Sequence, residues 1–350
     1  MPESRTELQA LGEFKLIDGL TKKFSLRHSS SIQGIGDDAA VIDVGGQYML
    51  VGTDMLLEGI HFDLTYCPLK HLGYKAVAVN VSDIAAMNGR AEQITVSMAV
   101  SNRFSVEALQ ELYEGIYLAC EHYQIDLVGG DTSSSAAGLV ISITAMGRVN
   151  KDEVCLRKGA RPYDLICVTG DLGAAYIGLQ VLNREKQVFQ ADPAMQPVLE
   201  PYKYMVERQL KPEARTDIVQ AMGKLQLVPT AMIDISDGLA SELFHISKAA
   251  GVGMTIYEDR LPIDKRTYDT AVAFNLDPIM CAVNGGEDYE LLFTIKQQDL
   301  KKVEGHPDIA LIGHVTELSQ GSHLVTKSGS VVPLRAQGWE HYKHASQNNK

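Results

Sequence analysis

The spacing of apolar residues changes along the chain between the two-residue period of strands and the longer period of helices. Apolar runs over residues 39–44 and 48–52 flank the pair Gly45-Gly46, which predicts a β-hairpin. The other elements expected in the first half are helices over 72–87 and 106–122 and strands over 94–100 and 139–149.

A polar, turn-rich stretch over residues 150–164 separates this half from the next. The second half is expected to contain strands over 165–169, 231–235 and 291–295, a helix from about residue 172 and a helix over 239–250. Mixed strands and helices in both halves predict an α/β (α+β) fold. Because 350 residues exceed what one core usually supports, we expect two domains, residues 1–150 and 151–345.

The composition is that of an ordinary soluble globular protein, with 45% apolar and 22% charged residues. No apolar run is long enough for a membrane span, and residues 1–4 do not begin a signal pattern. The five cysteines are scattered, which argues against disulfides and a zinc site and favours buried thiols. We therefore expect a cytoplasmic protein.

The formal net charge of −12 disfavours nucleic acid as a partner, because such binding depends on Lys and Arg at phosphates. Acidity does not exclude a small anionic substrate. A phosphate substrate would, however, need the help of cations.

Acidic residues recur in short segments rich in Gly, Ser and Thr. Turns that follow apolar runs are predicted to carry Asp37, Asp38, Asp54, Asp131, Asp234 and Asp237. Asp83 instead lies within the apolar helix predicted over 72–87. Gathered carboxylates repel one another, and magnesium prefers oxygen ligands, so the pattern favours a site for ATP and magnesium. Each Asp taken alone also fits a turn or a helix N-cap.

Other nucleotide-binding patterns are excluded. Residues 34–39 match the glycine pattern of dinucleotide-binding folds, but a strand and not a helix is predicted to follow. The phosphate-binding loop of P-loop enzymes and the catalytic loop of protein kinases are absent from the sequence.

These acidic segments resemble the ordered motifs of the thiamine-monophosphate kinase family. The resemblance runs from about residue 11 to 342. It is carried by Gly36-Asp37-Asp38-Ala39, residues 53–62 (TDMLLEGIHF), residues 75–87 (KAVAVNVSDIAAM), Gly129-Gly130-Asp131-Thr132, residues 234–239 (DISDGL) and residues 285–291 (GGEDYEL).

The resemblance implies a fold shared with aminoimidazole ribonucleotide synthetase. It implies a homodimer formed by the sheet of the N-terminal domain, with the C-terminal α/β domain covering a cleft. The implied reaction converts ATP and thiamine monophosphate into ADP and thiamine diphosphate, with several magnesium ions.

The resemblance also assigns roles to individual residues. The positions that match the family's magnesium ligands are Asp38, Thr53, Asp54, Asp83, Asp131, Asp234 and Asp237. The positions that match ATP contacts are Tyr113, Gly130, Asp131, Arg157 and Ser236. The positions that match contacts to thiamine phosphate are His61, Glu287 and Trp339. Gly52 departs from the Ser of some members, so a metal contact there could come only from its carbonyl.

The chemistry of the residues agrees with this assignment. Phosphoryl transfer depends on positioning and charge neutralisation, and a phosphate acceptor is already a nucleophile, so no general base and no covalent nucleophile are expected. Arg157 could steady a triphosphate or be a solvated cation in a charged turn. Trp339 could cover the core or stack on the thiamine, and Glu287 could accept a hydrogen bond from the aminopyrimidine.

Two alternatives stay open. The first is another ATP-using enzyme of the aminoimidazole ribonucleotide synthetase superfamily. The second is a non-catalytic sensor of nucleotides or thiamine phosphates, although all candidate metal ligands are retained.

Overall fold

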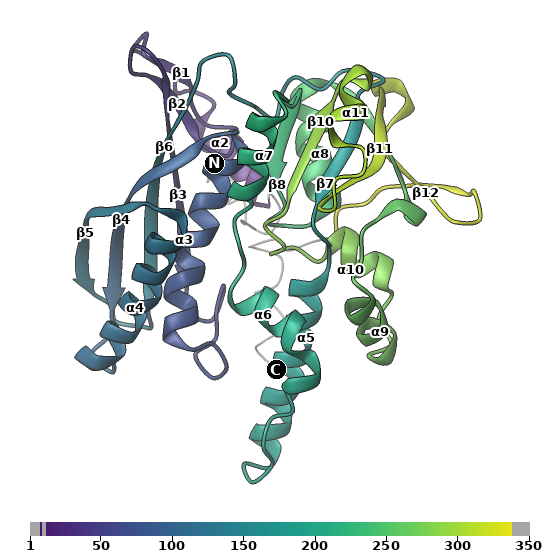
Figure 1. Cartoon of the computed structure of the whole chain (residues 1–350). Helices are drawn as coiled ribbons and strands as arrows, with labels where there is room; N and C mark the ends of the chain where they lie inside the picture. The colour runs from purple at the N-terminus through teal and green to yellow at the C-terminus, as the bar shows by residue number, and fades with distance from the viewer. Residues whose placement is uncertain (1–7, 9–11, 338–350) are drawn as a thin grey trace, which may run out of the picture.

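Two β-sheets, each with its own helices, stand side by side in a computed structural model of the chain (Figure 1). The structure describes residue 8 and residues 12–337. Trp339, the one predicted site residue beyond this range, lies outside the described residues.

The first sheet has the strand order β1-β2-β3-β6-β4-β5 in the described part of the chain. Its neighbours are antiparallel except for β4 and β5, which are parallel. The strands are β1 (Ser31–Gln33), β2 (Ala40–Asp43), β3 (Tyr48–Leu57), β4 (Arg90–Val100), β5 (Asp126–Ser134) and β6 (Val140–Val149).

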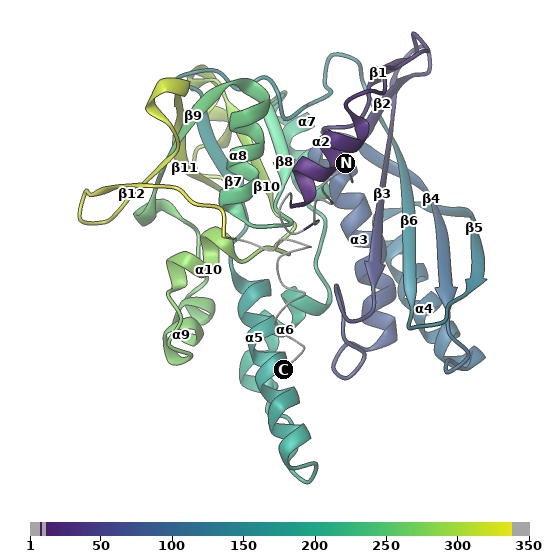
Figure 2. The same ribbon diagram turned by 180° about the vertical axis from the view of Figure 1, so that it is seen from behind.

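Two helices, α3 (Leu69–Ala86) and α4 (Val106–Tyr123), cover one face of this sheet. Leu50 and Leu56 of β3 and Ile143 of β6 point toward them and are buried. Residues that alternate with these point the other way, and Met55 is 53% exposed. Figure 2 shows that no described helix crosses β4, β5 or β6 on this outer face.

The second sheet has the order β13-β12-β9-β11-β7-β10-β8 among the described residues. Its strands are β7 (Leu165–Thr169), β8 (Ala231–Asp234), β9 (Val252–Tyr257), β10 (Leu291–Ile295), β11 (Ile309–Glu317), β12 (His323–Val325) and β13 (Val331–Pro333). All of β10 is buried because helices cover both faces. Residues of α8 (Leu239–Ala250) and α10 (Pro278–Asn284) pack on one face, and those of α7 (Thr216–Lys224) and α11 (Leu300–Val303) pack on the other.

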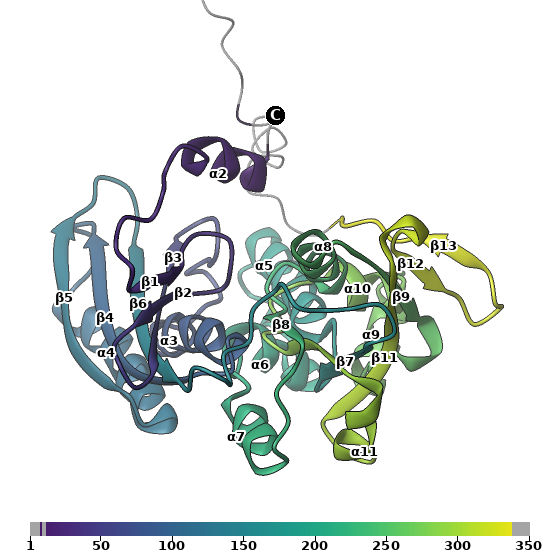
Figure 3. The same ribbon diagram turned by 90° about the horizontal axis from the view of Figure 1, so that it is seen from above.

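Helix α3 lies between the two sheets and contacts β3, β6 and β8 (Figure 3). The remaining helices are α2 (Glu13–Thr21), α5 (Ala174–Ala191), α6 (Lys203–Leu210) and α9 (Lys265–Ala273). Val181 of α5 and Val206 of α6 join the hydrophobic core of the first sheet, so the two halves of the chain share buried surface. Helix α3 is therefore placed to contribute side chains to any site between the halves.

The predicted hairpin, both predicted helices of the first half and the strands over 165–169 and 291–295 are confirmed. The expectation that Asp54 and Asp131 lie in turns is wrong. Asp54 is within β3, which pairs with β6 along its whole length, and Asp131 is within β5. Their Gly- and Asp-containing stretches are weak strand formers, and pairing with a neighbouring strand overrides that preference.

The five cysteines are free, as predicted, and Cys120 is the one that is only partly buried. None of the helices in the described part of the chain has the length and apolar character needed to span a membrane.

Candidate active site

Three carboxylates from distant parts of the chain converge between the two sheets. Asp38 precedes β2, Asp83 lies in the last turn of α3, and Asp234 ends β8. One oxygen atom from each of the three lies within 4.8 Å of the others. Such a group of oxygen donors fits a hard divalent cation.

Burial and mutual repulsion favour the protonated forms of these acids. Burial, and then the charge of Asp38, raise the pKa of Asp54 to about 6 and that of Asp234 to about 7. Burial raises the pKa of Asp83 well above its usual range, and Asp54, Asp234 and Asp38 raise it further. A bound cation would remove this penalty, so the carboxylates are arranged as expected for ligands of a metal ion.

Helix α3 orients several of these groups. The side-chain carbonyl of Asn80 accepts a hydrogen bond of 2.9 Å from the backbone N–H of Asp54. Ser82 donates a hydrogen bond of 2.6 Å to Asp234. Gly52 lies against the site, because a Cβ atom there would be 3.3 Å from the Asp83 carboxylate. Glycine at this position therefore leaves room for the Asp83 carboxylate.

Arg157 binds the acidic centre from the side. Its Nη2 atom lies 2.6 Å from Asp38 Oδ1, and its backbone N–H donates to Asp37 at 3.2 Å. The Arg157 side chain is 20% exposed, so the alternative of a fully solvated arginine does not apply. The guanidinium faces the same space as the carboxylates and could reach an anion held there.

A cleft of about 1340 Å³ opens over the acidic centre and is lined by both halves of the chain. Ten of the predicted site residues line it, namely Asp38, Thr53, Asp54, His61, Asp83, Arg157, Asp234, Ser236, Asp237 and Glu287. The tertiary structure therefore gathers most of the predicted residues around one space.

His61 and Glu287 lie on the walls of this cleft. His61 Nδ1 accepts a hydrogen bond of 3.0 Å from the backbone N–H of Leu57, which fixes the orientation of the ring. The Glu287 carboxylate is bound by Lys75 at 3.0 Å and by Gln209 at 2.5 Å. Glu287 has a φ of 58°, a conformation that non-glycine residues rarely adopt.

Thr53 offers only its backbone to the cleft. Its hydroxyl donates to the carbonyl of Ile143 at 3.0 Å and accepts from Thr144 at 3.1 Å. Thr53 is exposed on the outer face of the first sheet. A cation contact by Thr53 would therefore come from its carbonyl oxygen.

Three predicted residues, Tyr113, Gly130 and Asp131, do not line the cleft within this chain. Asp131 of β5 lies opposite Ser97 of β4, which lies opposite Ser142 of β6. Ser142 in turn lies opposite Met55 of β3, the neighbour of Asp54. Three strand spacings place Asp131 about 14 Å from Met55.

Tyr113 is on α4, where its ring centroid lies 5.9 Å from that of Tyr117. The roles assigned to Tyr113, Gly130 and Asp131 stay predictions.

The cleft also contains polar residues to which the sequence assigned no role. Glu242, in the first turn of α8, is buried and accepts a hydrogen bond of 2.9 Å from the Asp237 backbone N–H. His245 also lines the cleft, and burial together with Arg157 lowers its pKa to about 4. The sequence feature that could have indicated a role for Glu242 is its position shortly after the Asp237-Gly238 motif. An acidic residue in the first turn is, however, equally typical of any helix N-terminus.

Two family models match successive parts of the chain. The N-terminal domain of AIR synthase related proteins matches residues 36–149, and the C-terminal domain of these proteins matches residues 162–325. The fold and the acidic cleft therefore define an AIR synthase-related enzyme.

Relatives that match nearly the whole chain identify its family within this class. The chain is 34% identical to thiamine-monophosphate kinase of Bacillus subtilis, covering 95% of this chain and 100% of that protein. It is 32% identical to that of Escherichia coli, covering 95% of this chain and 99% of that protein. A solved structure described as AaThiL complexed with AMPPCP and TMP superposes with a TM-score of 0.82 at 32% identity, covering 97% of this chain and all of the other. The chain belongs to the thiamine-monophosphate kinase family, and it is a kinase.

Proposed function

We propose that the chain transfers the γ-phosphoryl group of ATP to thiamine monophosphate and forms thiamine diphosphate and ADP. The observation that carries this proposal is the convergence of Asp38, Asp83 and Asp234 in a cleft whose wall carries Glu287 and His61. The same cleft thus offers one region for cation-assisted phosphate binding and another for an organic cation. Relatives that share the full length of the chain carry the name of this activity.

Magnesium ions fit the oxygen donors of this cleft. Asp38, Asp54, Asp83 and Asp234 would hold them, with Asp237 and the carbonyl of Thr53 at the rim. When bound, the ions would neutralise the phosphate charges that the acidic cleft otherwise repels.

Transfer is proposed to be direct and in line. A phosphate oxygen of thiamine monophosphate forms a bond to the γ-phosphorus while the bond from that phosphorus to the β,γ-bridging oxygen breaks and ADP leaves. Arg157 and Ser236 line the cleft beside the acidic centre and would orient the triphosphate. The acceptor needs no deprotonation by the protein, so neither a general base nor a covalent nucleophile is assigned.

Recognition of the thiamine moiety is proposed to involve His61 and Glu287. The Glu287 carboxylate would accept a hydrogen bond from the amino group of the pyrimidine, and the acidic walls would attract the thiazolium cation. Trp339 keeps its predicted role in this contact and is not described by the structure.

The chain is proposed to act as a homodimer through the outer face of its first sheet. Met55 of β3 and Val128 of β5 are 53% and 56% exposed, and no described helix crosses β4, β5 or β6 on this face. Burying such a face against a second copy would cover these residues and Asp131 together. The cytoplasmic location stays a prediction of the sequence.

The experiment is an incubation with ATP, magnesium chloride and thiamine monophosphate, followed by chromatography of the products. We expect thiamine diphosphate and ADP in equal amounts, and loss of both when magnesium is removed with a chelator. ADP with inorganic phosphate instead of thiamine diphosphate would contradict the acceptor. Binding of both substrates without any product would favour a sensor.

A further inference from the structure

A buried ammonium group lies under the wall of the cleft. Lys75 is on α3, its side chain is 4% exposed, and its Nζ atom lies 3.0 Å from Glu287 Oε1. The same Nζ donates a hydrogen bond of 3.1 Å to the backbone carbonyl of Gln209 on α6. The Gln209 amide donates to Glu287 Oε2. Each oxygen of the Glu287 carboxylate therefore has one donor within the protein.

The backbone of this segment is held independently of Lys75. The N–H groups of Glu287 and Tyr289 donate to the carbonyls of Ser236 and Ile235 at 2.7 and 2.9 Å. These contacts keep two residues with positive φ, 58° at Glu287 and 51° at Tyr289, against the segment that follows β8.

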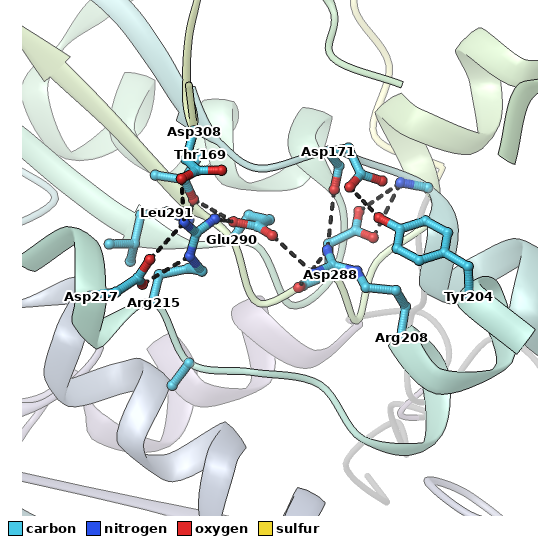
Figure 4. Close-up of polar contacts among 12 residues, drawn as sticks. Thr169, Asp171, Tyr204, Arg208, Arg215, Asp217, Asp288, Glu290, Leu291 and Asp308 are labelled. Atoms are coloured by element: carbon cyan, nitrogen blue, oxygen red, sulfur yellow. Dashed lines mark hydrogen bonds and ion pairs between the residues drawn. The ribbon is translucent and has the colours of Figure 1, made fainter. Parts of the chain in front are cut away.

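A second set of contacts holds the segment from the side of α6 (Figure 4). Arg208 donates to the carbonyl of Asp288 at 3.3 Å and pairs with Glu290 at 3.0 Å. Glu290 also pairs with Arg215 at 2.6 Å. These groups fix the main chain of the segment, whereas Lys75 contacts the Glu287 carboxylate and the carbonyl of Gln209.

We propose that Lys75, assisted by Gln209, is a positioning residue that makes the Glu287 carboxylate a fixed hydrogen-bond acceptor and so sets specificity for an amino group on the ligand. This inference rests on the proposed function. A carboxylate oxygen has two lone pairs, so one on each Glu287 oxygen stays available after Lys75 and Gln209 have bound. The Glu287 side chain is 29% exposed and lines the cleft, so a ligand can reach it.

The ammonium group is costly to bury, and a buried ion pair is weak evidence for a role in stability. Replacing a buried ion pair by apolar residues is often neutral or stabilising. A carboxylate held in one position rejects a ligand that presents a carbonyl instead of an amino group, because two acceptors would then face each other without a proton. The pair is thus better suited to recognition than to stability.

The test compares thiamine monophosphate with oxythiamine monophosphate, in which a carbonyl replaces the pyrimidine amino group. For Lys75→Met we expect the KM for thiamine monophosphate to rise about tenfold or more, with the KM for ATP within about twofold. The preference for the amino substrate over the oxo analogue, as the ratio of kcat/KM values, should fall about tenfold or more. Gln209→Met should also raise the KM for thiamine monophosphate and lower the preference for the amino substrate, each by a smaller factor.

A double-mutant cycle separates positioning from a general structural effect. In the Lys75→Met background, Glu287→Gln should change kcat/KM by less than about threefold, although it should be strongly deleterious alone. Lys70→Met is the matched control, because Lys70 is on the same helix and pairs with Glu114 at the surface. It should leave all constants unchanged.

Several outcomes would overturn the proposal. These are an unchanged preference for the amino substrate in Lys75→Met, an equal loss toward ATP and thiamine monophosphate, or independent effects of Lys75→Met and Glu287→Gln. If Lys75→Met fails to fold, the Gln209→Met variant decides by the same ratio, because Gln209 binds the other Glu287 oxygen. A wild-type chain that forms no thiamine diphosphate would instead refute the proposed function, and this inference with it.

Discussion

Asp83 illustrates how a single residue links stability to the site. It lies on an otherwise apolar part of α3, where Ile84, Ala85 and Ala86 are buried. Its carboxylate meets those of Asp38 and Asp234, so ionisation is unfavourable unless a cation is present. The residue is therefore expected to cost stability in the metal-free protein and to serve a bound metal ion.

Replacing Asp83 should separate these two effects. We expect Asp83→Asn to reduce turnover by about 10²-fold or more, because a charge that holds the phosphate-binding cations is lost. In chelator-treated protein the same change should raise the melting temperature by about 2 °C or more. Calorimetry with and without magnesium, together with the product assay, measures both effects. Lower metal-free stability of Asp83→Asn at pH 8 would contradict the repulsion.

The difference in metal-free stability between Asp83→Asn and the wild type should change with pH in a defined direction. The pKa values of Asp54 and Asp234 in the folded chain, about 6 and about 7, are above the ordinary 3.8. The acid forms are favoured by folding, so their contribution is present at low pH and is lost as the pH rises through about 7. Burial and the charges of Asp54 and Asp234 raise the pKa of Asp83 in the same direction, so the advantage of Asp83→Asn in metal-free protein should grow between pH 5 and pH 8.

Among the elements, α3 does most to connect the two halves of the chain. Its Lys75 pairs with Glu287, and its Asn80 accepts a hydrogen bond from Asp54. Ser82 donates to Asp234, and Asp83 is part of the acidic centre. Its helical period brings these positions to the sides that face the two sheets. The position of α3 is set in part by α4, against which it packs with backbone contact.

Two glycines, Gly73 of α3 and Gly115 of α4, allow this contact, and substitution should test it. A Cβ atom at Gly73 would lie 2.0 Å from the carbonyl oxygen of Leu112, so Gly73→Ala must push α3 and α4 apart. We expect a loss of about 2 kcal/mol or more in the free energy of unfolding, measured by urea denaturation. Gly223→Ala on α7 is the matched control, because nothing lies within 4 Å of its Cβ position. It should be neutral or stabilise by up to about 1 kcal/mol, and equal effects of the two substitutions would contradict the close packing.

At the level of elements, periodicity predicted most boundaries well. Helix α8 and strands β7 and β10 coincide with the predicted ranges because their apolar residues meet a core on one or both sides. Periodicity did not predict β5, since its exposed Gly, Asp and Ser residues carry no strand pattern. That strand exists because β4 pairs with it.

For the whole molecule, the outer face of the first sheet should decide the oligomeric state. Ser97 is exposed in β4 and points away from the buried side chains of Ile94 and Val96. We expect light scattering after gel filtration to give twice the chain's mass for the wild type and a shift toward monomer for Ser97→Arg, since a large charge would enter the interface.

Ser319→Arg provides the matched control for the oligomeric state. Ser319 is exposed on the second half of the chain, away from the first sheet. This variant should remain a dimer. A monomeric wild type, or an unchanged dimer in Ser97→Arg, would refute the proposed interface.

The sequence by itself determined the α/β class, most of the regular elements, the acidic motifs and the family to which the chain belongs. Each of these depends on local periodicity or on short motifs in a fixed order, and both can be recognised in the sequence alone. Only the tertiary structure decided that Asp38, Asp83 and Asp234 meet, that Lys75 binds Glu287, and that Asp131 lies away from this chain's own cleft. The physical reason is that these relations are set by the packing of α3 between two sheets and by strand order, and both join segments that are far apart in the sequence.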